Sequence, residues 1–146
     1  MKIYTIGFTK KSAERFFRLL KDNHITRLID IRLKPDGQLS GFAKQDDLAY
    51  FLRKLIGCEY YHFDFLAPSE DILTAYRQDK DWQRYEHRFE ALMDERNVLD
   101  QLDRAFFTEN ECCLLCSEDT PDQCHRRLVA ERLAHTWPDV EIVHLR

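Results

Sequence analysis

The sequence lacks long apolar runs, has few glycines and prolines, and carries no large excess of charge of either sign. A membrane-spanning helix needs about 18 continuous apolar residues, and no segment provides them. Four Gly and four Pro among 146 residues exclude collagen-like and low-complexity chains. A hydrophobic share of 44% with 33% charged residues is typical of globular proteins. We therefore expect one domain over residues 1–146, located in the cytoplasm and without membrane partners.

The cysteine pattern and the net charge argue against two further classes, disulfide-stapled proteins and broad nucleic-acid binders. The number of cysteines is odd, and three of them crowd one apolar run, which favours reduced thiols. They are Cys58, Cys112, Cys113, Cys116 and Cys124. A net charge of −4 gives a field that repels polyanions, so nucleic-acid binding would require a local basic patch and is not favoured.

Strand-like and helix-like segments alternate along the chain. The predicted strands are Lys2–Phe8, Thr26–Ile31, Glu59–Phe63, Cys112–Ser117 and Val140–Leu145. The predicted helices are one from the N-cap Ser12 to about Asn23, one over Asp46–Ile56 ended by Gly57, two or three within Ser69–Phe107, and one after Thr120. Leu33–Gly41 is predicted to be a loop. The alternation predicts an α/β domain with a predominantly parallel sheet and ligand-facing loops at the carboxyl ends of the strands.

The segment from Cys116 to Arg127 joins the fourth predicted strand to the last helix. The run from Thr120 to Gln123 fits a capping box, which predicts Thr120 as the N-cap and Pro121 as the first helical residue. Successive helical residues are separated by about 100°, which places His125 within the apolar side of that helix and Arg126 at its edge. We therefore expect both side chains to meet Gly7 and Arg32 at the carboxyl edge of the sheet.

Residues in this region are suited to bind an anion. Arg126 and Arg32 could donate bidentate hydrogen bonds to a phosphate or carboxylate beside a helix N-terminus. The pKa of a Cys124 thiol there would be lowered. Each residue also has a structural interpretation: a solvated or ion-paired Arg126, a core His125 with satisfied hydrogen bonds, and a buried apolar Cys124.

Two cysteine motifs do not predict a site. Cys113 and Cys116 match C-x-x-C, but residues three apart on a strand point to opposite faces, so neither zinc nor a redox dithiol fits. Cys116 also resembles a phosphatase nucleophile, but Asp122 stands where that chemistry needs an arginine. The sequence therefore predicts no metal site and no cofactor.

The motifs together resemble a known bacterial family, domain of unknown function 488. The resemblance runs from Thr5 to about Leu133, and its most specific part pairs Cys116-Ser117-Glu118 with Cys124-His125-Arg126. The other matching motifs are Thr5-Ile6-Gly7, Asp30-Ile31-Arg32, Gly41-Phe42-Ala43-Lys44, Tyr61-His62 and Leu66-Ala67-Pro68. The resemblance implies a Rossmann-like, three-layer α/β fold, and it implies no activity. By similarity, the functional candidates are Gly7, Asp30, Arg32, Cys116, Glu118, Cys124, His125 and Arg126.

Three hypotheses follow. The first is an enzyme acting on a phosphate-bearing small molecule or nucleotide, with Glu118 and His125 as acid and base or Cys124 as a thiolate nucleophile. Its predicted ligand-binding residues are Gly7, Asp30, Arg32, Lys44, Cys116 and Arg126. The second is a non-catalytic module that binds a nucleotide or a nucleic-acid end. The third is a protein-interaction domain whose polar cluster only holds loops; Asp30 and Arg32, which share a strand face, would then form an internal salt bridge.

Overall fold

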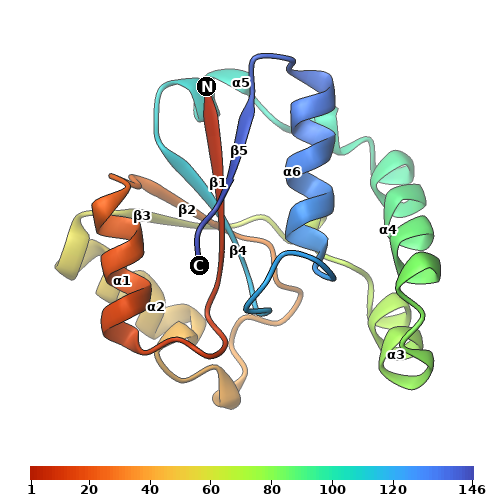
Figure 1. Ribbon diagram of the computed structural model, residues 1–146, viewed down its shortest axis with the longest axis horizontal. Helices are drawn as coiled ribbons and strands as arrows, with labels where there is room; N and C mark the ends of the chain where they lie inside the picture. The colour runs from red at the N-terminus through yellow and green to blue at the C-terminus, as the bar shows by residue number, and fades with distance from the viewer.

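A five-stranded sheet forms the centre of the computed structural model (Figure 1). The structure describes residues 1–146, except for the side chains of residues 38 and 39. The strands are β1 (Lys2–Gly7), β2 (Arg27–Asp30), β3 (Glu59–His62), β4 (Cys112–Cys116) and β5 (Glu141–His144). They lie in the order β3-β2-β4-β1-β5, and every pair is parallel. The predicted α/β class with a parallel sheet is therefore confirmed.

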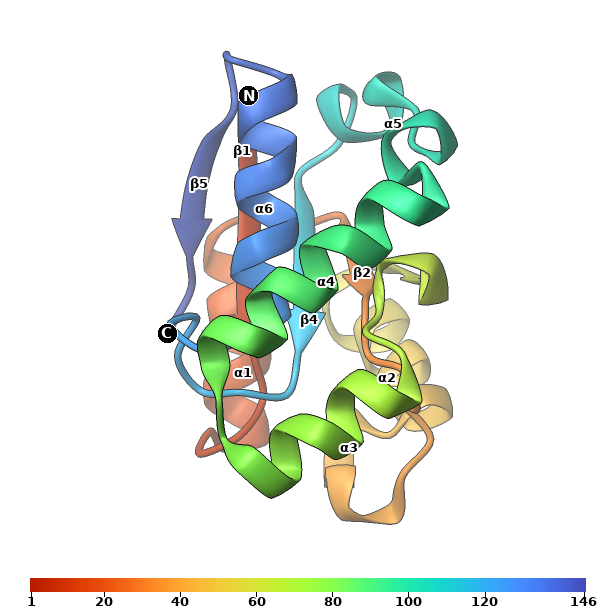
Figure 2. The same ribbon diagram turned by 90° about the vertical axis from the view of Figure 1, so that its right-hand side faces the viewer.

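Helices cover both faces of the sheet and complete three layers (Figures 1 and 2). One face is covered by α1 (Ala13–Asp22) and α2 (Gln45–Phe51), and the other by α4 (Trp82–Arg96) and α6 (His125–Thr136). The remaining helices are α3 (Glu70–Asp79), beside α4, and α5 (Arg104–Thr108). Because both faces are covered, all five residues of β4 are buried, as expected of a central parallel strand. Among the described residues, no helix combines the length and apolarity needed to cross a bilayer.

The helix boundaries agree with the predictions except at two places, the segment after β2 and the start of α6. Ser12 caps α1 by accepting a hydrogen bond from the Arg15 N–H at 3.1 Å, as predicted. After α2 the chain continues as a π-helical turn that ends at Gly57, whose φ of 64° is the left-handed conformation that glycine favours. The predicted loop Leu33–Gly41 is partly ordered, because a 3-10 segment spans Gln38–Ala43.

The second difference concerns the start of α6, where the predicted capping box is wrong. The helix begins at His125, and its N-cap is Cys124 in extended conformation, not Thr120. The side-chain oxygen of Gln123 accepts a hydrogen bond from the Tyr76 hydroxyl of α3 at 3.1 Å. In a capping box the same oxygen would accept from the backbone N–H of Thr120. Residues 117–124 therefore form a longer loop between β4 and α6 than the sequence predicts.

The connections create a crevice at the carboxyl edge of the sheet. After β2 the chain passes to the α2 face, whereas after the neighbouring β4 it passes to the α6 face. In parallel α/β folds, such a divergence between adjacent strands leaves an opening where ligands bind. The loops that follow β2 and β4 are the walls of that opening.

Candidate functional site

A cavity of about 430 Å³ lies between these two loops and the α3–α4 pair. Residues after β2 and after β4 line its inner side, and residues of α3 and the start of α4 line its outer side. Of the nine predicted site residues, five line the cavity: Arg32, Cys116, Glu118, Cys124 and His125. The other four, Gly7, Asp30, Lys44 and Arg126, do not.

Arg32 is buried and partly committed to an ion pair. Its Nε and Nη2 donate to the two carboxylate oxygens of Asp30 at 2.8 and 2.7 Å, and Nη2 also donates to the Ala43 carbonyl at 2.7 Å. Asp30 is fully buried and accepts a third hydrogen bond, from the Tyr60 hydroxyl at 2.6 Å. The predicted internal salt bridge is therefore present.

One nitrogen of Arg32 is left over. Its Nη1 is buried and has no hydrogen-bond partner among the described residues. Nε and Nη2 form one edge of the planar guanidinium, so Nη1 faces away from Asp30. Arg32 lines the cavity, so a ligand there that reached Nη1 would meet a charged donor with no other partner among the described residues.

His125 is held by both of its ring nitrogens. Nε2 lies 2.7 Å from the Ile31 carbonyl oxygen, which only accepts, so Nε2 carries the proton. Nδ1 is then the acceptor, and it lies 3.3 Å from the Cys116 Sγ. The Phe89 ring packs edge-on against the imidazole at a centroid distance of 5.5 Å. Both nitrogens of His125 are occupied by protein groups, so an acid–base role of His125 toward a ligand would have to pass through Cys116.

Cys116, and not Cys124, is the thiol with the lowered pKa. Burial by itself raises the pKa of Cys116. The pKa is nevertheless below the ordinary value, because the sulfur accepts hydrogen bonds from the Cys124 thiol and from the backbone N–H groups of Ser117 and Glu118, and because the charge of Arg126 is near. Burial, followed by the contact with Cys116, raises the pKa of Cys124 well above the ordinary value. The expectation of a lowered pKa at Cys124 is therefore wrong.

Cys124 and His125 are also closer together than helical geometry predicts. Adjacent helical residues point about 100° apart, but Cys124 precedes the helix and has extended dihedral angles of −140° and 138°. The ligand atoms of Cys116, Cys124 and His125 consequently all lie within 4.8 Å of one another. We call these three residues the thiol–imidazole cluster.

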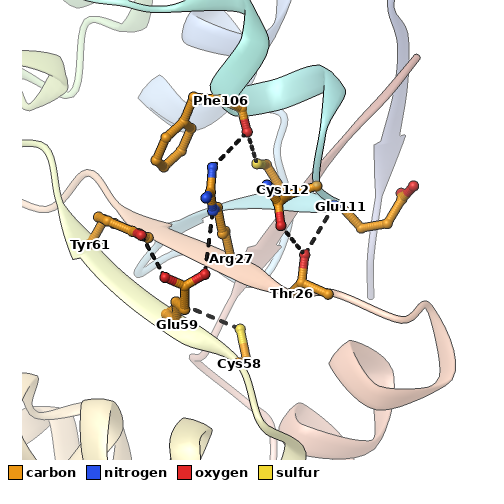
Figure 3. A network of polar contacts seen from close by, with 9 residues as sticks. Thr26, Arg27, Cys58, Glu59, Tyr61, Phe106, Glu111 and Cys112 are labelled. Atoms are coloured by element: carbon orange, nitrogen blue, oxygen red, sulfur yellow. Dashed lines mark hydrogen bonds and ion pairs between the residues drawn. The ribbon is translucent and has the colours of Figure 1, made fainter.

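The opposite edge of the sheet provides a comparison. Cys112 lies on the same face of β4 as Cys116, within a network that includes Arg27, Glu59 and Phe106 (Figure 3). Its Sγ contacts only the Phe106 carbonyl in that network, at 3.6 Å, and burial raises its pKa to about 12. The two cysteines of the same strand thus differ in pKa because Cys116 has hydrogen-bond donors and the charge of Arg126 near it.

Arg126 and Gly7 fix the loop after β4 instead of lining the cavity. Arg126 is fully buried and donates to the carbonyls of Glu118 at 2.6 Å and Asp119 at 3.3 Å, and to Thr5 Oγ1 at 3.4 Å. A Cβ on Gly7 would lie 1.5 Å from the Glu118 carbonyl oxygen. The close approach expected at Gly7 is therefore to protein backbone. The predicted meeting of Arg126 with Arg32 in one hollow is wrong.

The remaining two predicted residues lie outside the cavity. Asp30 is behind Arg32 and orients it, and Lys44 is the N-cap of α2. Glu118, in contrast, is an exposed side chain that lines the cavity.

Sequence reasoning missed the outer wall. The cavity is lined by Glu70, Leu73, Tyr76 and Arg77 of α3, by its C-cap Lys80, and by Trp82 and Tyr85 of α4. The spacing of three and four residues in α3 places its members on one helical face, which is a detectable signal. Nothing in the sequence shows that this face turns toward the loop after β4.

The cavity is more basic than the protein as a whole. Its lining carries four basic side chains, Arg32, Lys34, Arg77 and Lys80, against the two carboxylates Glu70 and Glu118, although the net charge of the chain is −4. Lys34 Nζ pairs with Glu70 at 3.0 Å, which ties the loop after β2 to α3. The arrangement favours an anionic ligand.

Comparison with known proteins places most of the chain in one family. The family described as Domain of unknown function DUF488 matches residues 12–133. No curated protein and no solved structure matches the chain. The match includes β2, β4, the thiol–imidazole cluster and all of α3 and α4. The chain therefore belongs to the DUF488 family, as its motifs predict.

Proposed function

We propose that the protein is an enzyme that binds a phosphate-bearing small molecule or nucleotide in the cavity and acts on it through Cys116. The observation that carries the proposal is the buried Nη1 of Arg32, which has no partner within the described structure and belongs to a cavity-lining residue. Leaving a buried charged donor without a partner costs on the order of 1–3 kcal/mol or more. A bound anion would remove that cost.

The composition of the walls supports a phosphate-bearing ligand with an attached ring. Lys34, Arg77 and Lys80 add positive charge around Arg32 and suit a group with more than one negative oxygen. Tyr76 and Trp82 add aromatic surface on the outer wall, which suits a nucleobase or a similar ring. The combination favours a nucleotide-like ligand over a simple carboxylate.

The chemistry follows from the contact between Cys116 and His125. Nδ1 of His125 accepts the thiol proton while Cys116 Sγ forms a bond to an electrophilic carbon or phosphorus of the ligand. The bond from that atom to its leaving group breaks, the leaving group keeps the electron pair, and Glu118 donates a proton to it.

In the second step an acceptor such as water attacks the same atom. Glu118 takes the proton of the acceptor, and the bond to Sγ breaks with its electron pair returning to sulfur. The proton on His125 then returns to Cys116. The net reaction transfers the group from its leaving group to the acceptor, so water as acceptor makes it a hydrolysis.

Ligand-dependent thermal shifts test the binding part. Inorganic phosphate and nucleoside mono- and diphosphates should raise the Tm of the wild type, because they bind only the folded state. Arg32→Lys keeps a charge for Asp30 but removes the spare donor, so the shift should be lost. Arg27→Lys, at the start of β2 and away from the cavity, is the matched control and should respond like the wild type. A panel that shifts no protein, or shifts Arg32→Lys equally, would contradict the proposal.

Turnover separates an enzyme from a binding module. Cys116→Ser should retain the ligand-dependent Tm shift and lose product formation, while Cys112→Ser should keep both. Ligand that is bound but recovered unchanged from the wild type, with any added acceptor, would favour the non-catalytic alternative.

A further inference from the structure

We propose that the thiol–imidazole cluster of Cys116, Cys124 and His125 is a binding site for a soft divalent transition metal, zinc above all, with one coordination position open to the cavity. Two thiolates and one imidazole are ligands that zinc prefers. Among the described residues, this is the group of histidine, cysteine and acidic side chains whose ligand atoms converge, all within 4.8 Å.

The spacing of the ligand atoms fits one ion. Bond lengths of about 2.3 Å to sulfur and about 2.1 Å to nitrogen, at tetrahedral angles, place neighbouring ligand atoms about 3.6 Å apart. The Sγ of Cys116 and Nδ1 of His125 lie 3.3 Å apart. A small outward movement of either side chain would therefore admit the ion.

The imidazole is already oriented as a metal ligand. A histidine bound to a metal through one nitrogen commonly donates its other N–H to a backbone carbonyl or a carboxylate, which fixes the tautomer. His125 donates its Nε2–H to the Ile31 carbonyl at 2.7 Å, which leaves the lone pair of Nδ1 directed at Cys116. The hydrogen bond that makes Nδ1 a proton acceptor thus also makes it a ligand.

The three ligands are held on rigid parts of the chain. Cys116 ends β4, Cys124 is the N-cap of α6 and His125 is its first residue. The loop between them is fixed by the hydrogen bonds from Arg126 to its carbonyls and by its packing on Gly7. Little ordering is needed when the metal binds, which favours affinity.

The site differs from the C-x-x-C pair that the sequence contains. Cys113 packs with the core on the α1 face of the sheet, whereas Cys116 faces the cavity. Three protein ligands leave a fourth tetrahedral position, as in catalytic zinc sites, and Cys116, Cys124 and His125 all line the cavity. Water or an anion held by Arg32 would complete the coordination.

This inference deepens the proposed function. It rests on that function only because the metal site and the proposed reaction both use Cys116. Zinc would neutralise the charge of the Cys116 thiolate and would occupy Nδ1 of His125, the nitrogen that accepts the thiol proton in the proposed reaction, so metal binding opposes covalent catalysis. Zinc is therefore a reversible inhibitor of the metal-free enzyme, and chelation restores the nucleophile.

Metal titration of the chelator-treated protein tests the inference. Cobalt(II) should give thiolate-to-metal charge-transfer absorption with one equivalent bound, and zinc should displace it. Cys116→Ser and Cys124→Ser should lose this absorption, His125→Asn should bind at least tenfold more weakly, and the matched control Cys112→Ser should behave like the wild type. Absence of the absorption, or equal absorption in the Cys116→Ser/Cys124→Ser double variant, would overturn the site.

A measurement on the wild type alone covers the case in which a variant does not fold. Zinc K-edge X-ray absorption should show two sulfur and one nitrogen ligands with one light-atom neighbour, and a shell of nitrogen and oxygen only would refute the site. Zinc should also stop alkylation of Cys116 while leaving the Tm shift by inorganic phosphate measurable. Loss of the phosphate response with intact zinc binding would count against the proposed function alone.

Discussion

Arg32 and Arg126 are both buried near the site, but their hydrogen bonds differ. Arg126 uses Nε, Nη1 and Nη2 on Thr5 and on two loop carbonyls, whereas Arg32 has Nη1 left over. Sequence reasoning treated both as anion ligands, because an arginine beside a helix start and one beside a strand end look alike before their partners are known. The pairing of Asp30 with Arg32 could be predicted, since alternate residues of a strand share a face.

Substitution of Arg126 should reduce stability without affecting ligand binding. Arg126→Gln leaves the carbonyls of Glu118 and Asp119 without their charged donor, and the expected loss is about 2–4 kcal/mol in the free energy of unfolding. Urea unfolding measures the loss, and a phosphate titration at a temperature where the variant is folded should give the wild-type affinity. A stable variant with weakened binding would instead make Arg126 a ligand contact.

Substitution of Gly7 should be similarly costly. In Gly7→Ala the added methyl group would lie 1.5 Å from the Glu118 carbonyl oxygen, so the loop after β4 must move. We expect a loss of about 1–3 kcal/mol or more in urea unfolding. Gly37→Ala is the control, because its nearest neighbour would be 3.8 Å away and its φ is −63°. Equal stabilities of the two variants would show that the loop tolerates the methyl group.

At the scale of elements, local patterns predicted the strands and helices well, and long-range contacts account for the failures. Each strand was located to within two residues, because continuous apolar runs mark strands covered on both faces. The start of α6 was wrong because Tyr76, 47 residues away, binds the side chain of Gln123. Cys124 was preferred over Cys116 because a thiol beside a helix start and cationic residues was expected to have a lowered pKa.

Phe89 is one of the aromatic residues of α4 that contact the cluster or lie beside it. Phe89 is fully buried, and its ring packs against the imidazole of His125. Phe89→Ala should lower the free energy of unfolding by about 3–5 kcal/mol, because it leaves a cavity where α4 meets the first turn of α6. Denaturant unfolding measures this, with the exposed α4 change Glu95→Ala as the control. A loss no larger than that of the control would mean that the helix packs independently of the cluster.

At the scale of the whole molecule, the order of the strands places the site. The crevice between β2 and β4 brings together Arg32, from the loop after β2, and Cys116, the last residue of β4, although they are 84 residues apart in sequence. The convergence at the carboxyl edge could be predicted from the alternation of strands and helices. The position of α3 and α4 as the outer wall of the cavity could not be predicted. A charged helix face can line a cavity or lie in solvent, and the sequence does not distinguish the two.

A half-buried histidine, His144 near the C-terminal end of the sequence, should make stability depend on pH. Thr5 Oγ1 accepts a hydrogen bond from Arg126 Nε at 3.4 Å and lies 2.6 Å from His144 Nδ1, so a charged arginine stands close to the imidazole. Burial, followed by the charge of Arg126, lowers its pKa below the ordinary value. Below about pH 6.5 the unfolded chain gains a proton that the folded chain does not, so the free energy of unfolding falls with falling pH.

The matched variant is His144→Asn, which cannot titrate. Urea unfolding between about pH 7.5 and about pH 5.5 should show a smaller decrease for this variant than for the wild type, because the other titrating groups are common to both. Identical decreases would show that His144 does not contribute to the pH dependence.

The most direct test of the central claim is the rate at which iodoacetamide alkylates Cys116 in the metal-free protein, followed by peptide mass mapping. If Arg32 Nη1 holds a phosphate-bearing ligand beside this thiol, inorganic phosphate or a nucleoside diphosphate should slow alkylation in the wild type and in Arg27→Lys, and should have no effect in Arg32→Lys. A rate that the ligands leave unchanged in the wild type, or slow equally in Arg32→Lys, would contradict a shared site for the anion and Cys116.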